Sequence, residues 1–159
     1  MKRLAAARLI LFSLVFSLPF SGVIASSAVA AQKSISVEKP WVRASVGVTG
    51  PTAAFMTIVN RSSTPDRLIR VRAAFAGMVQ IHRTVIKNDQ AQMMHVGQVD
   101  IPAGGKALLK PGGFHIMLMR LKKPVVKGTK VKLVLTFEKA GEVTVDAEVL
   151  SHGSRGPKH

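Results

Sequence analysis

KPGGFHIMLMRL, residues 110–121, decides the fold class of this chain. Its Pro-Gly-Gly start is typical of a tight turn, and the residues after it alternate in a way that favours a strand over a helix. Successive side chains of a strand point to opposite faces, so His115, Met117 and Met119 share one face while the Ile and Leu between them share the other.

The same alternation recurs in the rest of the chain. Short runs of Val and Ile with polar residues are bounded by turns such as Thr49-Gly50-Pro51 and Pro102-Ala103-Gly104-Gly105, and no long window has a helical apolar period. We therefore predict one all-β domain, a sandwich or Greek-key barrel of about eight strands. The expected strands are Ser34–Ala44, Ala53–Asn60, Arg67–Arg72, Met78–Ile86, Gly97–Ile101, Phe114–Leu121, Lys130–Glu138 and Val143–Leu150.

The first thirty residues have the features of a secretory signal peptide. Basic residues precede an apolar run at Leu9–Phe20, which is shorter than the roughly 20 residues that a membrane span needs. The small residues of Ala28-Val29-Ala30 predict cleavage after Ala30 or, as a second choice, after Ala31; the alternative is an uncleaved N-terminal anchor. The chain has no cysteine, so no lipid anchor is expected. From the signal-peptide features we predict an exported protein of the periplasm.

The predicted organisation has three parts. Residues 1–30 are the signal peptide and residues 31–150 the β-domain, which at 47% hydrophobic residues for the whole chain has ample material for a core. The tail, residues 151–159, is polar with two glycines, and we expect it to be disordered.

The chain is strongly basic, with 23 Lys and Arg against 8 Asp and Glu. Removing Lys2, Arg3 and Arg8 with the signal peptide lowers the net charge from +15 to about +12. Nucleic acid is disfavoured as a partner, because the protein is expected to be exported and has almost no aromatic residues to stack bases. An acidic protein or peripheral contact with an anionic membrane fits better, and a generally basic solvated surface is the alternative.

The titratable residues argue against an enzyme. The eight acidic residues are separated along the chain with no spacing that suggests a catalytic pair, and no serine elbow or phosphate-binding glycine loop is present.

Histidine and methionine are the informative residues, and they gather in Met93-Met94-His95 and in the stretch from His115 to Met119. His82 lies on an alternating strand, while Met56 and Met78 are interpreted as core residues. Thioethers favour Cu(I) over Zn²⁺, Mg²⁺ or Ca²⁺, and an electron-transfer copper site would need a cysteine, which the chain lacks. These residues indicate copper carriage.

The order and spacing of these residues resemble the periplasmic copper chaperones called PCu(A)C. Their pattern H-x10-M-x21-H-x-M is matched by His82, Met93, His115 and Met117. The resemblance covers roughly Ile35 to Leu150. It is carried also by Trp41-Val42-Arg43-Ala44, the strand Ala53–Asn60, Asp66-Arg67-Leu68, Ile101-Pro102-Ala103-Gly104-Gly105, Lys110–Met119 and Leu133–Glu138.

The resemblance implies a cupredoxin-like β-fold and one Cu(I) ion bound by His82, Met93, His115 and Met117. It further implies delivery of copper to apo-proteins such as the CuA-bearing subunit of cytochrome c oxidase, or exchange with other copper carriers. Beside this ligand set, Met94 is expected on the face opposite Met93. His95 shares the face of Met93 and is a candidate auxiliary ligand, and Met119, on the face of Met117, is expected to shield the metal from water.

Three features depart from the family. Arg83 follows the first histidine, where many relatives have methionine or an acidic residue, and Asn88-Asp89-Gln90 stands in place of an acidic-glycine turn. The tail retains only His152 and His159 of a Met- and His-rich extension, so no strong second copper site is predicted. Three other functions stay open: copper scavenging or tolerance, a metal-independent exported binding domain, and a copper-dependent enzyme.

Overall fold

The computed structural model of the chain describes residues 34–157. The predicted signal peptide, both cleavage positions and His159 lie outside the described residues. The described part includes no helix of the length and hydrophobicity that a membrane span requires.

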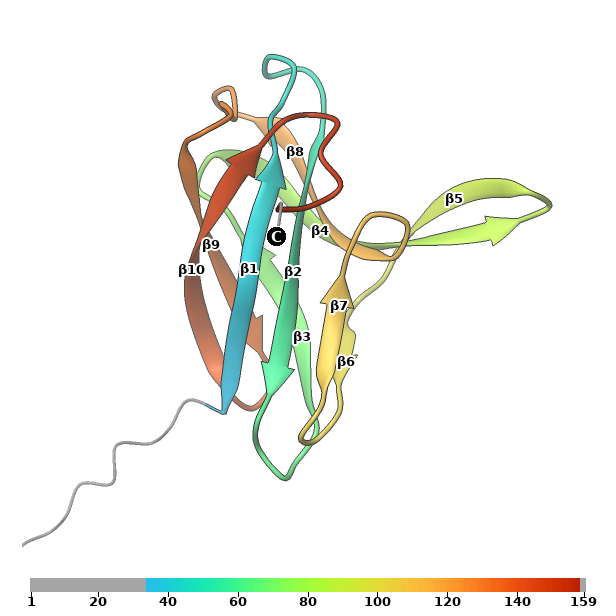
Figure 1. Cartoon of the computed structure of the whole chain (residues 1–159), viewed down its shortest axis with the longest axis vertical. Coiled ribbons are helices and arrows are strands. Elements are labelled where there is room, and N and C mark those ends of the chain that lie inside the picture. The colour runs from blue at the N-terminus through green and yellow to red at the C-terminus, as the bar shows by residue number, and fades with distance from the viewer. Residues whose placement is uncertain (1–33, 158–159) are drawn as a thin grey trace, which may run out of the picture. The chain divides into compact units, whose positions relative to one another are not determined.

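Residues 34–157 fold into strands and turns with no helix, which confirms the all-β prediction (Figure 1). The strands in this part of the chain number ten, two more than expected. They are β1 (Ile35–Arg43), β2 (Thr52–Asn60), β3 (Asp66–Arg72), β4 (Ala76–Lys87), β5 (Gln90–His95), β6 (Val99–Ile101), β7 (Lys106–Leu109), β8 (Phe114–Leu121), β9 (Lys130–Phe137) and β10 (Gly141–Leu150).

The strands hydrogen-bond in the order β5-β4-β8-β7-β2-β1-β10-β9-β3-β6. Most neighbours are antiparallel, but β1 runs parallel to β10, and β7 to β8. The sheet curls over so that β3 packs against β4 and encloses one core, while the β4–β5 hairpin projects from the side (Figure 1). The side chains of Ile58, Leu118 and Leu133 in this core have no exposed surface, and burial of each contributes about 1.5–3 kcal/mol.

Two strands were not expected from the sequence. All six residues of β5 are exposed, so it has no apolar-polar alternation to reveal it. β7 is four residues long, too short for a pattern, and is held by β2 through pairs such as Ile58 with Ala107.

Asp66, the first residue of β3, links that strand to a neighbouring turn. Its buried carboxylate accepts hydrogen bonds from the backbone N–H groups of Arg67 (2.7 Å), Lys139 (2.9 Å) and Ala140 (3.0 Å). Desolvation alone would raise the pKa of this carboxyl group, but the three hydrogen bonds and the charge of Lys139 outweigh it and lower the pKa. The start of β3 is thereby tied to the turn between β9 and β10.

The segment after β10, for which disorder is expected from its polarity, forms hydrogen bonds with residues at the end of β1. His152 Nδ1 lies 3.1 Å from the carbonyl oxygen of Ala44, and Arg43 Nε donates to the carbonyl oxygen of Ser154 (3.0 Å). Residues 151–157 therefore fold back onto the end of β1.

Candidate metal centre

Three adjacent strands, β5, β4 and β8, carry the four residues matched to the family pattern. His82 of β4 lies directly opposite His95 on one side and His115 on the other. Thr84 lies opposite Met93, and Gln80 opposite Met117. Since Gln80, His82 and Thr84 alternate along β4, their partners all lie on one face of the sheet.

The turn before β8 sets the position of His115. Gly112 has φ 79°, a conformation that favours glycine, and the carbonyl of Gly113 accepts a hydrogen bond from the backbone N–H of Thr84 (3.1 Å). The same carbonyl accepts from His115 Nδ1 at 3.0 Å. Because a carbonyl oxygen cannot donate, Nδ1 carries a proton, so Nε2 is the nitrogen that has the lone pair when the ring is neutral.

Aromatic side chains pack around His115, which is only 5% exposed. Its ring lies 6.3 Å from that of Phe55, and Phe55 stacks on Trp41 with ring centroids 4.4 Å apart. The guanidinium of Arg43 lies 5.3 Å from the centroid of the Phe55 ring. The ring of His115 is thus held in place by aromatic packing on the β8 side of the candidate site.

His82 has an unpaired ring nitrogen. Its Nε2 lies 3.1 Å from Gln80 Oε1, while Nδ1 is buried and has no hydrogen-bond partner among the described residues. The His82 ring centroid is 5.9 Å from that of His115 and 5.9 Å from that of His95. Burial, and then the positive charges that His115 and His95 can carry, lower the pKa of His82 and favour the neutral imidazole that metal binding requires.

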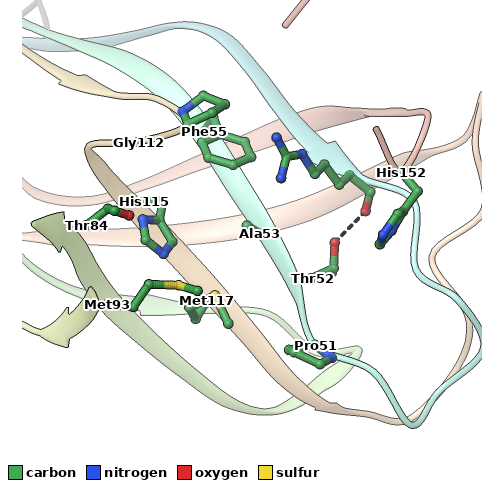
Figure 2. A pocket seen from close by; sticks show the side chains of 12 residues that line it. Pro51, Thr52, Ala53, Phe55, Thr84, Met93, Gly112, His115, Met117 and His152 are labelled. Carbon is green, nitrogen blue, oxygen red and sulfur yellow. Dashed lines mark hydrogen bonds between the residues drawn. The ribbon is translucent and has the colours of Figure 1, made fainter. Parts of the chain in front are cut away.

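A cavity of about 350 Å³ opens beside His115. Figure 2 shows the side chains of Met93 and Met117 next to each other at its wall, with the His115 ring pointing toward them. His82 does not line this cavity, but its ring lies beside that of His115.

The structure separates the remaining candidates. Met93 is 63% exposed, and His95 is exposed on the same face of β5. Met94 lies on the opposite face, across from Arg83, as the alternation predicts. Met119 is opposite Met78 and lies outside the cavity wall. Met56 is buried in the core, as interpreted from the sequence.

Several residues of the cavity were not recognised as site residues from the sequence. Arg43, Thr52 and Pro51 line it from β1, β2 and the loop between them, and His152 reaches it from the C-terminal segment. Thr84 also lines the cavity. The sequence could have indicated this, because Thr84 lies two residues after His82 on a strand and therefore shares its face.

Nitrogen and oxygen side chains form no metal site by themselves in the part of the chain that the structure describes. Among residues 34–157, no three His, Asp or Glu side chains are grouped closely enough to hold an ion. A metal at this face would therefore need the thioethers of Met93 and Met117, a donor set that suits Cu(I).

The fold and this face of the sheet define the class of the PCuAC domains. The copper-bound PCuAC domain from PmoF2 is 33% identical, with a TM-score of 0.64 over 74% of this chain and 93% of that domain. The apo PCuAC domain from PmoF2 is 31% identical, with a TM-score of 0.65 over 78% of this chain and 95% of that one. The Cu(I) form of DR1885 from Deinococcus radiodurans is 28% identical, with a TM-score of 0.59 over 87% of this chain and 97% of that one. These similarities confirm the cupredoxin-like fold and the resemblance to PCu(A)C proteins.

Within this class the chain belongs to the LpqE-like family, "Putative lipoprotein LpqE-like", whose profile matches residues 35–149. "Putative lipoprotein Lxx21020" of Leifsonia xyli subsp. xyli is 38% identical over 104 residues. This match spans 65% of the present chain and 61% of that relative.

Proposed function

We propose that the protein is a periplasmic copper chaperone, which binds one Cu(I) ion through His82, Met93, His115 and Met117 and transfers it to apo-proteins. The observation that carries the proposal is the meeting of two imidazoles and two thioethers on one face of β5, β4 and β8. Two of the solved PCuAC structures were determined with copper bound, which supports the choice of metal.

The donor chemistry fits Cu(I). All four donors are neutral when the histidines are unprotonated, and thioethers are soft ligands that prefer Cu(I). His82 Nδ1 is buried without a hydrogen-bond partner among the described residues, so a metal would satisfy an otherwise unpaired atom. The binding residues are expected to hold the ion without redox cycling, since no thiolate is available.

Transfer follows from the unequal burial of the ligands. His115 is 5% exposed and is hydrogen-bonded to the β8 turn, whereas Met93 is 63% exposed on the hairpin. We expect an acceptor to displace Met93 first and His115 last. His95, exposed beside His82, is proposed as an auxiliary donor during this exchange. Met119 lies on the face of Met117 but outside the cavity wall, and is proposed to shield the metal from water.

The proposed destination is an exported copper protein, with the CuA-bearing subunit of cytochrome c oxidase as the leading acceptor and other copper carriers as exchange partners. Export is supported by the basic and apolar leader of residues 1–30 and by the naming of the Leifsonia relative as a lipoprotein. The functional domain is proposed to span residues 31–150, and the protein to carry copper without catalysing a reaction.

An anaerobic Cu(I) titration against a chromophoric competitor tests the proposal, using the chain from Gln32 onward, which is a compact unit by itself. One tight equivalent is expected. Met117→Ile keeps the bulk, removes the sulfur and should weaken binding, whereas Met94→Ile on the opposite face is the matched control and should not. No binding above the competitor, or equal loss in both variants, would reject the four-ligand site.

A further inference from the structure

Two loops meet at the end of the sandwich where β1 ends (Figure 1). One joins β1 to β2, residues 44–51, and the other joins β8 to β9, residues 122–129. Ser45 N–H donates to the Val125 carbonyl (2.9 Å), and Val125 N–H donates to Ser45 Oγ (2.9 Å). These two bonds fix the loops side by side, so their exposed side chains form one surface.

Three aliphatic side chains project from this surface. Val46 is 70% exposed, Val126 is 57% and Val48 is 42%, while Val125 between the loops is buried. We call Val46, Val48 and Val126 the valine tip. Single exposed apolar residues are ordinary on protein surfaces, but three on two hydrogen-bonded loops indicate a contact site.

Positive charge surrounds the valine tip. Lys122, Lys123 and Lys127 are exposed on the same loop as Val126, and none of them forms an ion pair among the described residues. Neither loop contains an acidic residue. On the strands that follow, Glu148 of β10 lies opposite Lys130 of β9 in the strand register.

The C-terminal segment, which Arg43 anchors to the end of β1 through the Ser154 carbonyl, also carries an exposed arginine, Arg155. The ion pairs of the described residues lie elsewhere, on β3, β6, β9 and β10 and the turn after β9. The surface thus combines projecting aliphatic groups with unneutralised cations.

We propose that the valine tip and its lysines dock the protein peripherally onto an anionic phospholipid bilayer. Valine side chains enter the headgroup layer, and the ammonium groups of Lys122, Lys123 and Lys127 pair with lipid phosphates. A bilayer fits better than an acidic protein, because it receives both kinds of group at once: exposed aliphatic side chains enter at the headgroup level, while lysines that form no ion pair among the described residues meet anionic lipid. The docking does not depend on the copper function.

The contribution of the lysines to membrane binding can be estimated. Each lysine close to an anionic membrane contributes about fivefold to the partition coefficient, and the effect falls off within a Debye length of about 8–10 Å. Loss of three lysines should therefore lower binding about a hundredfold at low salt, and high salt should remove most of the binding.

Co-sedimentation with vesicles tests the docking, using the chain from Gln32 so that the apolar leader cannot bind lipid itself. Vesicles contain phosphatidylcholine alone or with about one third phosphatidylglycerol. Binding is expected only with phosphatidylglycerol. It should fall about a hundredfold in the triple variant K122Q/K123Q/K127Q and about tenfold in V46S/V48S/V126S.

Matched controls separate the tip from the general basic surface. K87Q/K106Q/K110Q removes three exposed lysines elsewhere, and I69S/L108S removes exposed aliphatic side chains elsewhere. Both controls should bind vesicles nearly as the parent does, and all variants should melt and bind Cu(I) like the parent. Absence of binding to anionic vesicles, or equal losses in the controls, would overturn the proposal without affecting the copper site.

Discussion

The two sides of the metal centre differ in how firmly the fold holds them. β8 is a central strand between β4 and β7, with Ile116 and Leu118 fully buried beneath His115 and Met117. β5 is an edge strand on a projecting hairpin, and all six of its residues are exposed (Figure 1). In the proposed copper site, the β8 side would therefore retain the metal and the β5 side would release it.

The difference has a physical basis in local stability. Elements with many buried apolar contacts open rarely, whereas exposed hairpins open at a lower free-energy cost. A chaperone needs both, because a fully buried site exchanges slowly and a fully exposed one holds copper weakly. Variants of the β8 residues should therefore change mainly the Cu(I) affinity, and variants of the β5 residues mainly the rate of Cu(I) release.

The largest effect is expected for His115→Ala. It should lower Cu(I) affinity by about a hundredfold or more, since even groups that only support a metal ligand contribute about 10–100-fold. Competitive titration measures this, and His152→Ala is the control, because His152 lines the same cavity but is exposed on the C-terminal segment. Normal binding in His115→Ala would show that His115 does not hold the metal.

Met93→Ile should have a smaller effect on affinity, about tenfold, with most of it in a faster dissociation of Cu(I). The melting temperature should not change, because the Met93 side chain is 63% exposed and packs little. Stopped-flow transfer to a chromophoric chelator measures the rate, beside Met94→Ile as control. A loss of thermal stability with the loss of copper would mean that the hairpin is part of the core.

The sequence predicted β8 well and β5 poorly, and the difference in burial between the two strands explains both results. The alternation of FHIMLMRL reflects burial on one face, and the structure has a strand over Phe114–Leu121 as expected. β5 is exposed on both faces, so nothing in QAQMMH distinguishes a strand from a loop.

The candidate ligands could be named because His82, Met93, His115 and Met117 match the spacing of the resembled family, but the surroundings of the proposed site could not be predicted. The bond from His115 Nδ1 to the Gly113 carbonyl and the stacking of Trp41 on Phe55 depend on how distant strands meet. The position of the C-terminal segment was not predictable either, because its hydrogen bonds to Arg43 and Ala44 join residues far apart in the sequence.

His82, on the strand between the two sides, should make the apo-protein sensitive to pH. Its pKa is lowered by burial and by the neighbouring histidines, so the unfolded chain takes up a proton at a higher pH, about 6.5, than the folded one does. The contribution of neutral His82 to stability is complete above that pH, and is lost as the pH falls toward the lowered folded value. Thermal melts from neutral to mildly acidic pH should show a decrease of a few degrees that is smaller in His82→Gln. An identical pH profile in the variant would contradict this assignment.

The smallest effect is expected for His95→Ala. His95 lies on the face of Met93 with its ring 5.9 Å from that of His82, yet it is exposed on the edge strand, where surface substitutions change free energies by about 0.5 kcal/mol or less. Cu(I) affinity should therefore fall by no more than about two- to threefold, while transfer to a chelator becomes slower, because an auxiliary donor that holds the departing ion is removed. The same titration and stopped-flow measurements apply, with His152→Ala as the matched exposed histidine. An affinity loss as large as that of Met93→Ile would instead make the hairpin supply two permanent ligands, and the site would then be held equally from both sides.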